Sequence, residues 1–267
     1  MTPIKVGIGQ IRMEWSGRAN TKAMIWAIKQ AADSGARLCV FPELAVTGFH
    51  RQIRAEATPD AVRDRLLEVQ QTSARHSMVV VSGAPTFHAD GRVFNSCVFI
   101  SERGEVAGVV DKIGLTPAEE TFFARGSARS CVELLGCRTT AVLCREIDDL
   151  EHLEAELPAI SPQIIFWPGM MRPAVDGSES THVQHAQQLA RCTGAFIIQA
   201  NWPNSLNYPE ESAEAGHSVV LDPSGEELIR LPMAAAGVGV FDLGQSNLQW
   251  HAQVESEVGE KAGDGAR

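Results

Sequence analysis

One cysteine of this chain stands where an apolar run ends and charged residues begin. The segment Thr140-Ala-Val-Leu-Cys144-Arg-Glu146 places Cys144 at that junction, which is unusual for a cysteine that only fills a core. Two other apolar runs end in the same way, with Glu43 after Leu38-Cys-Val-Phe-Pro and Lys112 after Val106-Ala-Gly-Val-Val-Asp. The three side chains are a candidate nucleophile, a candidate base and a candidate cation.

These three residues are far apart in sequence, but each follows the carboxyl end of a predicted strand. In open α/β sheets the ligand crevice lies outside the carboxyl ends of the strands, so we expect Glu43, Lys112 and Cys144 to meet in one pocket. A thiol of ordinary pKa is mostly protonated at neutral pH. Cys144 therefore needs a base that takes its proton or a cation that favours the thiolate, and Glu43 and Lys112 are residues of those types.

The predicted elements repeat in two halves, each reading strand, helix, strand, helix, strand and hairpin. Helix 60–75 carries its apolar residues in a one-sided stripe, which is typical of a helix that docks on a sheet. The repeat predicts two matching sheets packed face to face with helices outside, a four-layer αββα sandwich of the α/β class. The first half has strands 4–10, 37–41, 78–83, 94–101 and 105–111 and helices 19–34 and 60–75; the second has strands 138–143, 163–167, 195–200, 217–222 and 226–230 and helices 147–157 and 179–193.

Composition narrows the class of partner. The chain has 267 residues, 44% of them hydrophobic, and a formal charge of −10 from 33 acidic and 23 basic residues. Nucleic-acid and anionic-membrane surfaces need an excess of Lys and Arg, so this balance favours a small molecule or another protein as partner. No run approaches the roughly 20 apolar residues of a membrane span, and the amino terminus enters a strand without a leader pattern, which predicts a cytoplasmic protein.

We expect one domain over residues 1–247, followed by a polar tail. Residues 248–267 end in Glu-Lys-Ala-Gly-Asp-Gly-Ala-Arg and have little apolar content, which is typical of a segment that is mobile or wraps a partner subunit. His182 and His185 are three apart on a predicted helix, but no third ligand follows with recognisable spacing, so we predict no metal site. Gly237-Val-Gly239 lacks a following phosphate-binding helix and is interpreted as a strand.

The ordered motifs resemble those of the nitrilase, or carbon-nitrogen hydrolase, superfamily from Ile4 to about Leu243. Each motif alone is weakly specific, but their number and order are highly specific together. The resemblance implies the αββα fold, a homodimer or higher homo-oligomer, and hydrolysis of an amide-like C–N bond without metal or cofactor. The motifs are Gln10, Asn20, Phe41-Pro-Glu43-Leu-Ala-Val-Thr-Gly48-Phe49, Lys112-Ile-Gly-Leu-Thr-Pro117-Ala-Glu119, Phe122-Phe-Ala-Arg-Gly126, Cys144, Asn201 and Ser218 through Gly225.

The same resemblance implies that Glu43, Lys112 and Cys144 form a catalytic triad, with Glu119 as an additional glutamate that orients the site. Attack of the thiol on a carboxamide creates an oxyanion, which Lys112 and the backbone N–H after Cys144 would stabilise. Glu43 would pass the thiol proton to the leaving amine and then activate water to release the acid from a thioester.

Three departures from the family pattern limit how finely the substrate can be named. Family members commonly carry an aromatic-basic pair before the catalytic lysine and a histidine two residues after it, where this chain has Val110-Asp111 and Gly114. Many amidases carry an aromatic and an acidic residue after the nucleophile, and nitrilases carry Trp-Glu, where this chain has Arg145-Glu146. The missing tryptophan counts against nitriles as preferred substrates.

Several residues near the predicted strand ends are candidates for binding the substrate. Arg145 either holds a substrate carboxylate in a bidentate fork or pairs with Glu146, Asp148 or Asp149. The other candidates either line the pocket or pack over it: Trp167, Met170, Arg172, Asn201 and His50.

We therefore expect a thiol hydrolase that acts on a small linear carboxamide and releases ammonia, and an amide that also carries a carboxylate is a candidate substrate. Hydrolysis of N-carbamoyl amino acids is the nearest chemical alternative, because it uses the same triad. The altered surroundings of Lys112 and Cys144 leave a second alternative, a catalytically weak binding or scaffold protein.

Overall fold

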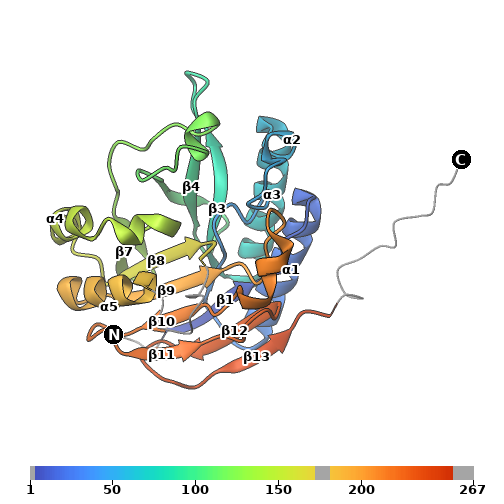
Figure 1. The fold of residues 1–267 in the computed structure, drawn as a ribbon. Coiled ribbons are helices and arrows are strands. Elements are labelled where there is room, and N and C mark those ends of the chain that lie inside the picture. The colour runs from blue at the N-terminus through green and yellow to red at the C-terminus, as the bar shows by residue number, and fades with distance from the viewer. Residues whose placement is uncertain (1–3, 172–180, 255–267) are drawn as a thin grey trace, which may run out of the picture.

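The strands of the computed structural model, which describes residues 4–171 and 181–254, form two sheets (Figure 1). The seven-stranded sheet has the order β13-β12-β1-β2-β3-β4-β5, and the six-stranded sheet has the order β11-β10-β9-β8-β7-β6. The first contains β1 (Lys5–Gln10), β2 (Leu38–Val40), β3 (Val79–Phe87), β4 (Val93–Ile100), β5 (Val106–Asp111), β12 (Gly237–Asp242) and β13 (Gln249–Ala252). The second contains β6 (Val132–Leu134), β7 (Cys137–Ala141), β8 (Ile164–Gly169), β9 (Phe196–Asn201), β10 (Val219–Leu221) and β11 (Glu227–Arg230).

Helices cover the outer face of each sheet. The long helices α1 (Gly17–Asp33) and α3 (Pro59–His76) pack on the seven-stranded sheet, where they share one apolar cluster with its strands. Helices α4 (Leu150–Ile160) and α5 (Thr181–Thr193) share another cluster with the six-stranded sheet. The remaining helical segments are short: α2 (Ile53–Glu56) and the 3₁₀ turns η1 (Glu119–Thr121), η2 (Cys144–Asp148) and η3 (Pro209–Glu214).

A third apolar cluster lies between the two sheets and completes the four layers. Val6 and Phe99 come to it from the seven-stranded sheet, and Phe166 and Ile198 from the six-stranded one. The rings of Phe99 and Phe166 meet edge to face across the interface, with centroids 6.0 Å apart. Each fully buried side chain of this size stabilises the fold by about 1.5–3 kcal/mol. The predicted αββα sandwich is confirmed.

The strand directions bring three strand ends to one place. Strands β1, β2 and β3 are parallel, and the two antiparallel steps through β4 return β5 to the direction of β2. Strands β7, β8 and β9 are parallel to one another in the second sheet. Glu43, Lys112 and Cys144 follow the carboxyl ends of β2, β5 and β7.

Two expected boundaries differ from the structure. Helix α4 begins at Leu150 and not near 147, because the residues after β7 first form the tight turn η2. Residues 249–252, expected at the start of the tail, form β13 and pair with β12. The backbone groups of a strand can pair whatever its side chains are, so a polar segment can still extend a sheet. The tail residues 255–267 lie outside the described part of the chain.

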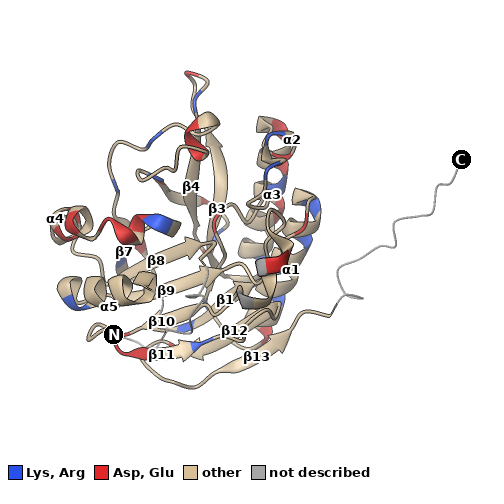
Figure 2. Ribbon diagram, viewed as in Figure 1, with Lys and Arg blue, Asp and Glu red and all other residues tan. Residues whose placement is uncertain are grey.

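Charged side chains lie mostly on helices, turns and loops, and few lie on the strands (Figure 2). Charges on those outer elements are solvated, whereas a charge buried near a strand end needs a partner. Within the described residues no helix has the length and apolar content needed to cross a membrane.

Candidate active site

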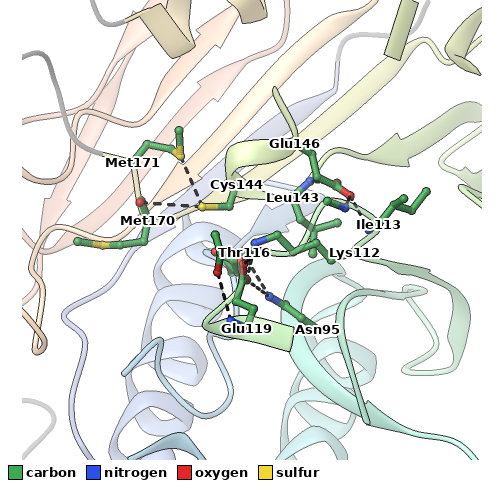
Figure 3. A network of polar contacts seen from close by, with 12 residues as sticks. Asn95, Lys112, Ile113, Thr116, Glu119, Leu143, Cys144, Glu146, Met170 and Met171 are labelled. Carbon is green, nitrogen blue, oxygen red and sulfur yellow. Dashed lines mark hydrogen bonds and ion pairs between the residues drawn. The ribbon is translucent and has the colours of Figure 1, made fainter. Parts of the chain in front are cut away.

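A buried ion-pair network lies where β2 and β5 end (Figure 3). The Lys112 ammonium donates to Oε1 of Glu43 and to Oε1 of Glu119, and both distances are 2.6 Å. The Lys112 and Glu43 side chains are 1% and 0% exposed, and that of Glu119 is 7% exposed. Charges that deep are stable only when they are paired and hydrogen-bonded. The structure therefore brings the predicted lysine and both predicted glutamates together.

Asn95 belongs to this network, although sequence reasoning missed it. Its Nδ2 donates to Oε1 of Glu43 over 2.8 Å and to Oε1 of Glu119 over 3.3 Å. The signal that could have found it is a polar amide within the apolar strand β4, where it is fully buried. Because Lys112 and Asn95 both use Oε1 of Glu43, the other oxygen, Oε2, receives no hydrogen bond from the described residues. That oxygen is left available to accept a proton.

Glu119 is held by the loop that follows Lys112. Its Oε2 accepts the backbone N–H of Thr116 over 2.8 Å, and the Thr116 hydroxyl accepts the N–H of Glu119. Burial opposes its charge, but the Lys112 ammonium and these donors outweigh burial and lower the pKa of Glu119. Glu119 is therefore a fixed negative charge that orients the ammonium group.

Cys144 occupies a strained turn between β7 and η2. Its φ is +52°, a left-handed conformation that side chains other than glycine rarely adopt and that costs of order 1–3 kcal/mol. The thiol lies 4.0 Å from the carbonyl oxygen of Met170 and 3.5 Å from the sulfur of Met171. Burial and the charge of Glu43 raise the pKa of Cys144, and the opposing effect of Lys112 is smaller. The sulfur is thus a neutral thiol within the field of both charged residues.

The remaining charges of the network set where a proton can go. Burial raises the pKa of Glu43 above its ordinary value, although Lys112 and Asn95 favour the carboxylate. Burial also disfavours the Lys112 ammonium, but the negative charges around it prevail and its pKa is raised. Lys112 therefore stays protonated, and Glu43 is the group whose basicity is matched to removing a thiol proton.

Two buried tryptophans hold the backbone of the catalytic candidates. The indole N–H of Trp167 donates to the carbonyl oxygen of Cys144 over 2.9 Å, and that of Trp202 donates to the carbonyl oxygen of Glu43 over 2.8 Å. Both side chains are fully buried. Trp167 was expected to line the substrate pocket or to pack over it. The structure places it in the apolar cluster that the six-stranded sheet shares with helices α4 and α5.

Gly83 lets β3 approach the glutamate turn. A Cβ at this position would lie 2.1 Å from the backbone nitrogen of Leu44 and 2.6 Å from the carbonyl carbon of Glu43. Real Cβ contacts are never that short, so only glycine permits this approach of the two backbones.

The other expected substrate-binding residues have different places. Asn201 receives the N–H of Met171 at its Oδ1 and donates to the carbonyls of Met171 and Gly216, so its amide is engaged by the backbone. His50 is 4% exposed, donates from Nε2 to the carbonyl oxygen of Thr47 over 3.1 Å and contacts the Trp15 ring. Both side chains therefore bond to nearby backbone groups, and none of these contacts is with Lys112, Glu43 or Glu119.

The structure describes two of the three remaining candidates. Met170 is half-buried, and its carbonyl oxygen is the one that faces Cys144. Arg145 is exposed, and its side chain forms no hydrogen bond or ion pair within residues 4–171 and 181–254. The expected pairing of Arg145 with its acidic neighbours is absent there, because Glu146 turns inward and Asp148 bonds to His182 and His185 at 2.7 and 3.1 Å. Arg172 lies outside the described residues.

Comparison with known proteins supports the resemblance seen in the motifs. The chain is 38% identical over 109 residues to the glutamine-dependent NAD(+) synthetase of Mycobacterium bovis, a match that covers 40% of the chain but only 16% of the synthetase. It is 29% identical to the arylacetonitrilase of Macrophomina phaseolina, with 96% of the chain and 87% of that protein covered.

A solved amidase from Nesterenkonia sp. shares the fold, with a TM-score of 0.77, 20% identity and 91% of each chain covered. At that level of identity the likeness speaks for the four-layer architecture and not for a substrate. The sequence model of the carbon-nitrogen hydrolase family matches residues 5–250, which is nearly the whole described chain. This protein is therefore a member of the carbon-nitrogen hydrolase family.

Proposed function

We propose that this chain is a thiol hydrolase that cleaves the C–N bond of a small linear carboxamide and releases a carboxylic acid and ammonia. The observation that supports this most directly is the position of the Lys112 ammonium. It is fixed between two buried carboxylates, and its charge favours the thiolate form of Cys144. Such a network has no evident structural purpose, because a buried ion pair is a weak source of stability.

In the first half of the reaction the thiol proton passes to Oε2 of Glu43 as Sγ attacks the amide carbon. The carbonyl oxygen becomes an oxyanion, which the Lys112 ammonium and the backbone N–H of Arg145 stabilise. Glu43 then gives the proton to the amide nitrogen, the C–N bond breaks, and ammonia leaves a thioester on Cys144.

In the second half a water molecule replaces ammonia. Glu43 takes one of its protons, the hydroxide attacks the thioester carbon, and the C–S bond breaks as the proton returns to sulfur. The products are the free carboxylic acid and the neutral thiol, so the enzyme returns to its starting state.

We further propose that Arg145 selects amides that carry a carboxylate. Arg145 directly follows the nucleophile in sequence. Its side chain is exposed, and its guanidinium has no partner within the described residues. A guanidinium can bind a carboxylate with two parallel hydrogen bonds. The matching synthetases are named for their use of glutamine, which carries a linear side-chain carboxamide and a carboxylate. Glutamine-like ω-amides are thus the substrates to test first.

Ammonia release from short amides, ω-amides of dicarboxylic acids, N-carbamoyl amino acids and nitriles tests the reaction. We expect turnover of an amide class that is lost in Cys144→Ala. Preferred release from carbamoyl compounds would instead favour the carbamoyl amino acid hydrolase. Silence across the panel, together with slow alkylation of Cys144, would favour the catalytically weak scaffold protein.

Arg145→Ala tests the selection of acidic amides. We expect kcat/KM for an amide with a carboxylate to fall at least about tenfold, since a charged hydrogen bond contributes about 1.5–3 kcal/mol. A neutral amide of the same length is the matched control and should keep its kcat/KM. Equal loss for both substrates would contradict the carboxylate fork.

A further inference from the structure

Glu146 is a buried carboxylate that the mechanism above does not use. Its side chain is 2% exposed, and its two oxygens accept four hydrogen bonds. Oε1 accepts the backbone N–H groups of Ile113 and Gly114 over 2.6 and 2.9 Å. Oε2 accepts the backbone N–H of Leu143 over 2.7 Å and a guanidinium N–H of Arg129 over 3.2 Å.

The backbone donors flank two residues of the proposed active site. Ile113 directly follows Lys112, and Leu143 directly precedes Cys144. Lys112 follows a strand of the seven-stranded sheet and Cys144 follows a strand of the six-stranded sheet. One carboxylate therefore ties together segments that belong to different sheets, and Figure 3 shows it between Leu143 and Ile113.

Arg129 is the buried positive charge that pairs with this carboxylate. Its side chain is 1% exposed, and besides Glu146 it bonds to the carbonyl oxygen of Ala141 and to Glu156. An ionised carboxylate accepts hydrogen bonds at both oxygens, whereas an amide accepts at only one of its two polar atoms. Only the ionised acid can therefore satisfy donors from both loops at once.

We propose that Glu146 is a positioning residue, which sets the place of the Lys112 ammonium relative to the Cys144 sulfur by joining the backbone segments that carry them. This inference rests on the proposed thiol chemistry, in which the two groups act on the same reacting carbonyl. Without the carboxylate, the two loops are free to shift relative to each other. A misplacement of order 1 Å in a reacting group lowers the rate by about 100-fold.

Glu146→Gln tests the proposal, with Glu156→Gln as its matched control. The control removes the other carboxylate that binds Arg129. It leaves the bonds from Glu146 to the backbone N–H groups of Ile113, Gly114 and Leu143 in place. We expect Glu146→Gln to lower kcat by about 100-fold with little change in KM, because the lost geometry serves the chemical step. Glu156→Gln should keep both constants within about twofold of wild type.

Alkylation of Cys144 by iodoacetamide, followed by peptide mapping, provides a readout that needs no substrate. Mapping is required because Cys131 and Cys192 are exposed and will also react. We expect the Cys144 rate to fall in Glu146→Gln and to stay unchanged in Glu156→Gln. If wild-type Cys144 is alkylated but no amide is hydrolysed, the proposed function fails while this test of Glu146 still stands.

The inference is overturned if Glu146→Gln keeps the wild-type kcat and alkylation rate, or if Glu156→Gln loses as much as it does. Glu146→Asp serves if the Gln variant does not fold, because it keeps the charge on Arg129 but is one methylene too short to reach both loops. Full activity in the Asp variant would equally rule out a clamp that depends on reach.

Discussion

Trp167→Phe separates a tryptophan that binds substrate from one that holds the nucleophile turn. The indole N–H donates to the carbonyl oxygen of Cys144 over 2.9 Å, and the side chain is fully buried. Phenylalanine keeps an aromatic ring and removes the donor, which leaves a buried carbonyl without its partner at a cost of about 1–3 kcal/mol. In a domain of this size each 1 kcal/mol lowers Tm by about 2–4 °C, so Tm should fall by about 2–12 °C.

The loss of activity follows from the strain at Cys144. Its φ of +52° persists because the surroundings hold the turn, and the Trp167 bond is one of those constraints. When the turn relaxes, the sulfur moves away from the reacting carbonyl. We expect kcat to fall by about 10- to 100-fold and KM to change little, because the fully buried indole acts through the carbonyl oxygen of Cys144.

Steady-state kinetics and thermal unfolding are measured together, with Ser73→Ala as the control. Ser73 is also fully buried, and its hydroxyl donates to the carbonyl oxygens of Met78 and Ser101, away from the Lys112 network. The control should lose a similar amount of Tm and keep its kcat. Wild-type kcat in Trp167→Phe, or an effect on KM alone, would refute the positioning role and return Trp167 to the substrate pocket.

Two further predictions concern the charges of the site. Burial raises the pKa of Glu43, and Glu43 can take the thiol proton only as the carboxylate. The value of kcat/KM should therefore rise with pH through an apparent pKa above the ordinary 4.5. A pH-rate profile with its acid limb below that value would contradict the role of Glu43 as the base. Lys112→Met leaves the carboxylates of Glu43 and Glu119 without the cation between them. The free energy of unfolding, measured in urea, should fall by about 3–5 kcal/mol at pH 8 and by less at pH 5, where protonation relieves the repulsion. An equal fall at both pH values would contradict repulsion between buried charges.

The sequence alone determined the residues that perform the proposed chemistry. Glu43, Lys112 and Cys144 each end an apolar run, and a run of that kind followed by an ionisable residue marks a strand end at the rim of a sheet. The repeat of two halves was equally visible, because the period of apolar residues along a helix or strand reports which face is buried. Such patterns are local and need no knowledge of partners.

Only the tertiary structure decided how these residues are held. Asn95 is 52 residues from Glu43, and Glu146 is 33 residues from Ile113, yet each pair is in hydrogen-bond contact. Sequence neighbours suggested that Arg145 could pair with Glu146, but the η2 turn directs one side chain outward and the other inward. A hydrogen bond depends on a distance of about 3 Å in space, which the spacing of residues along the chain does not specify.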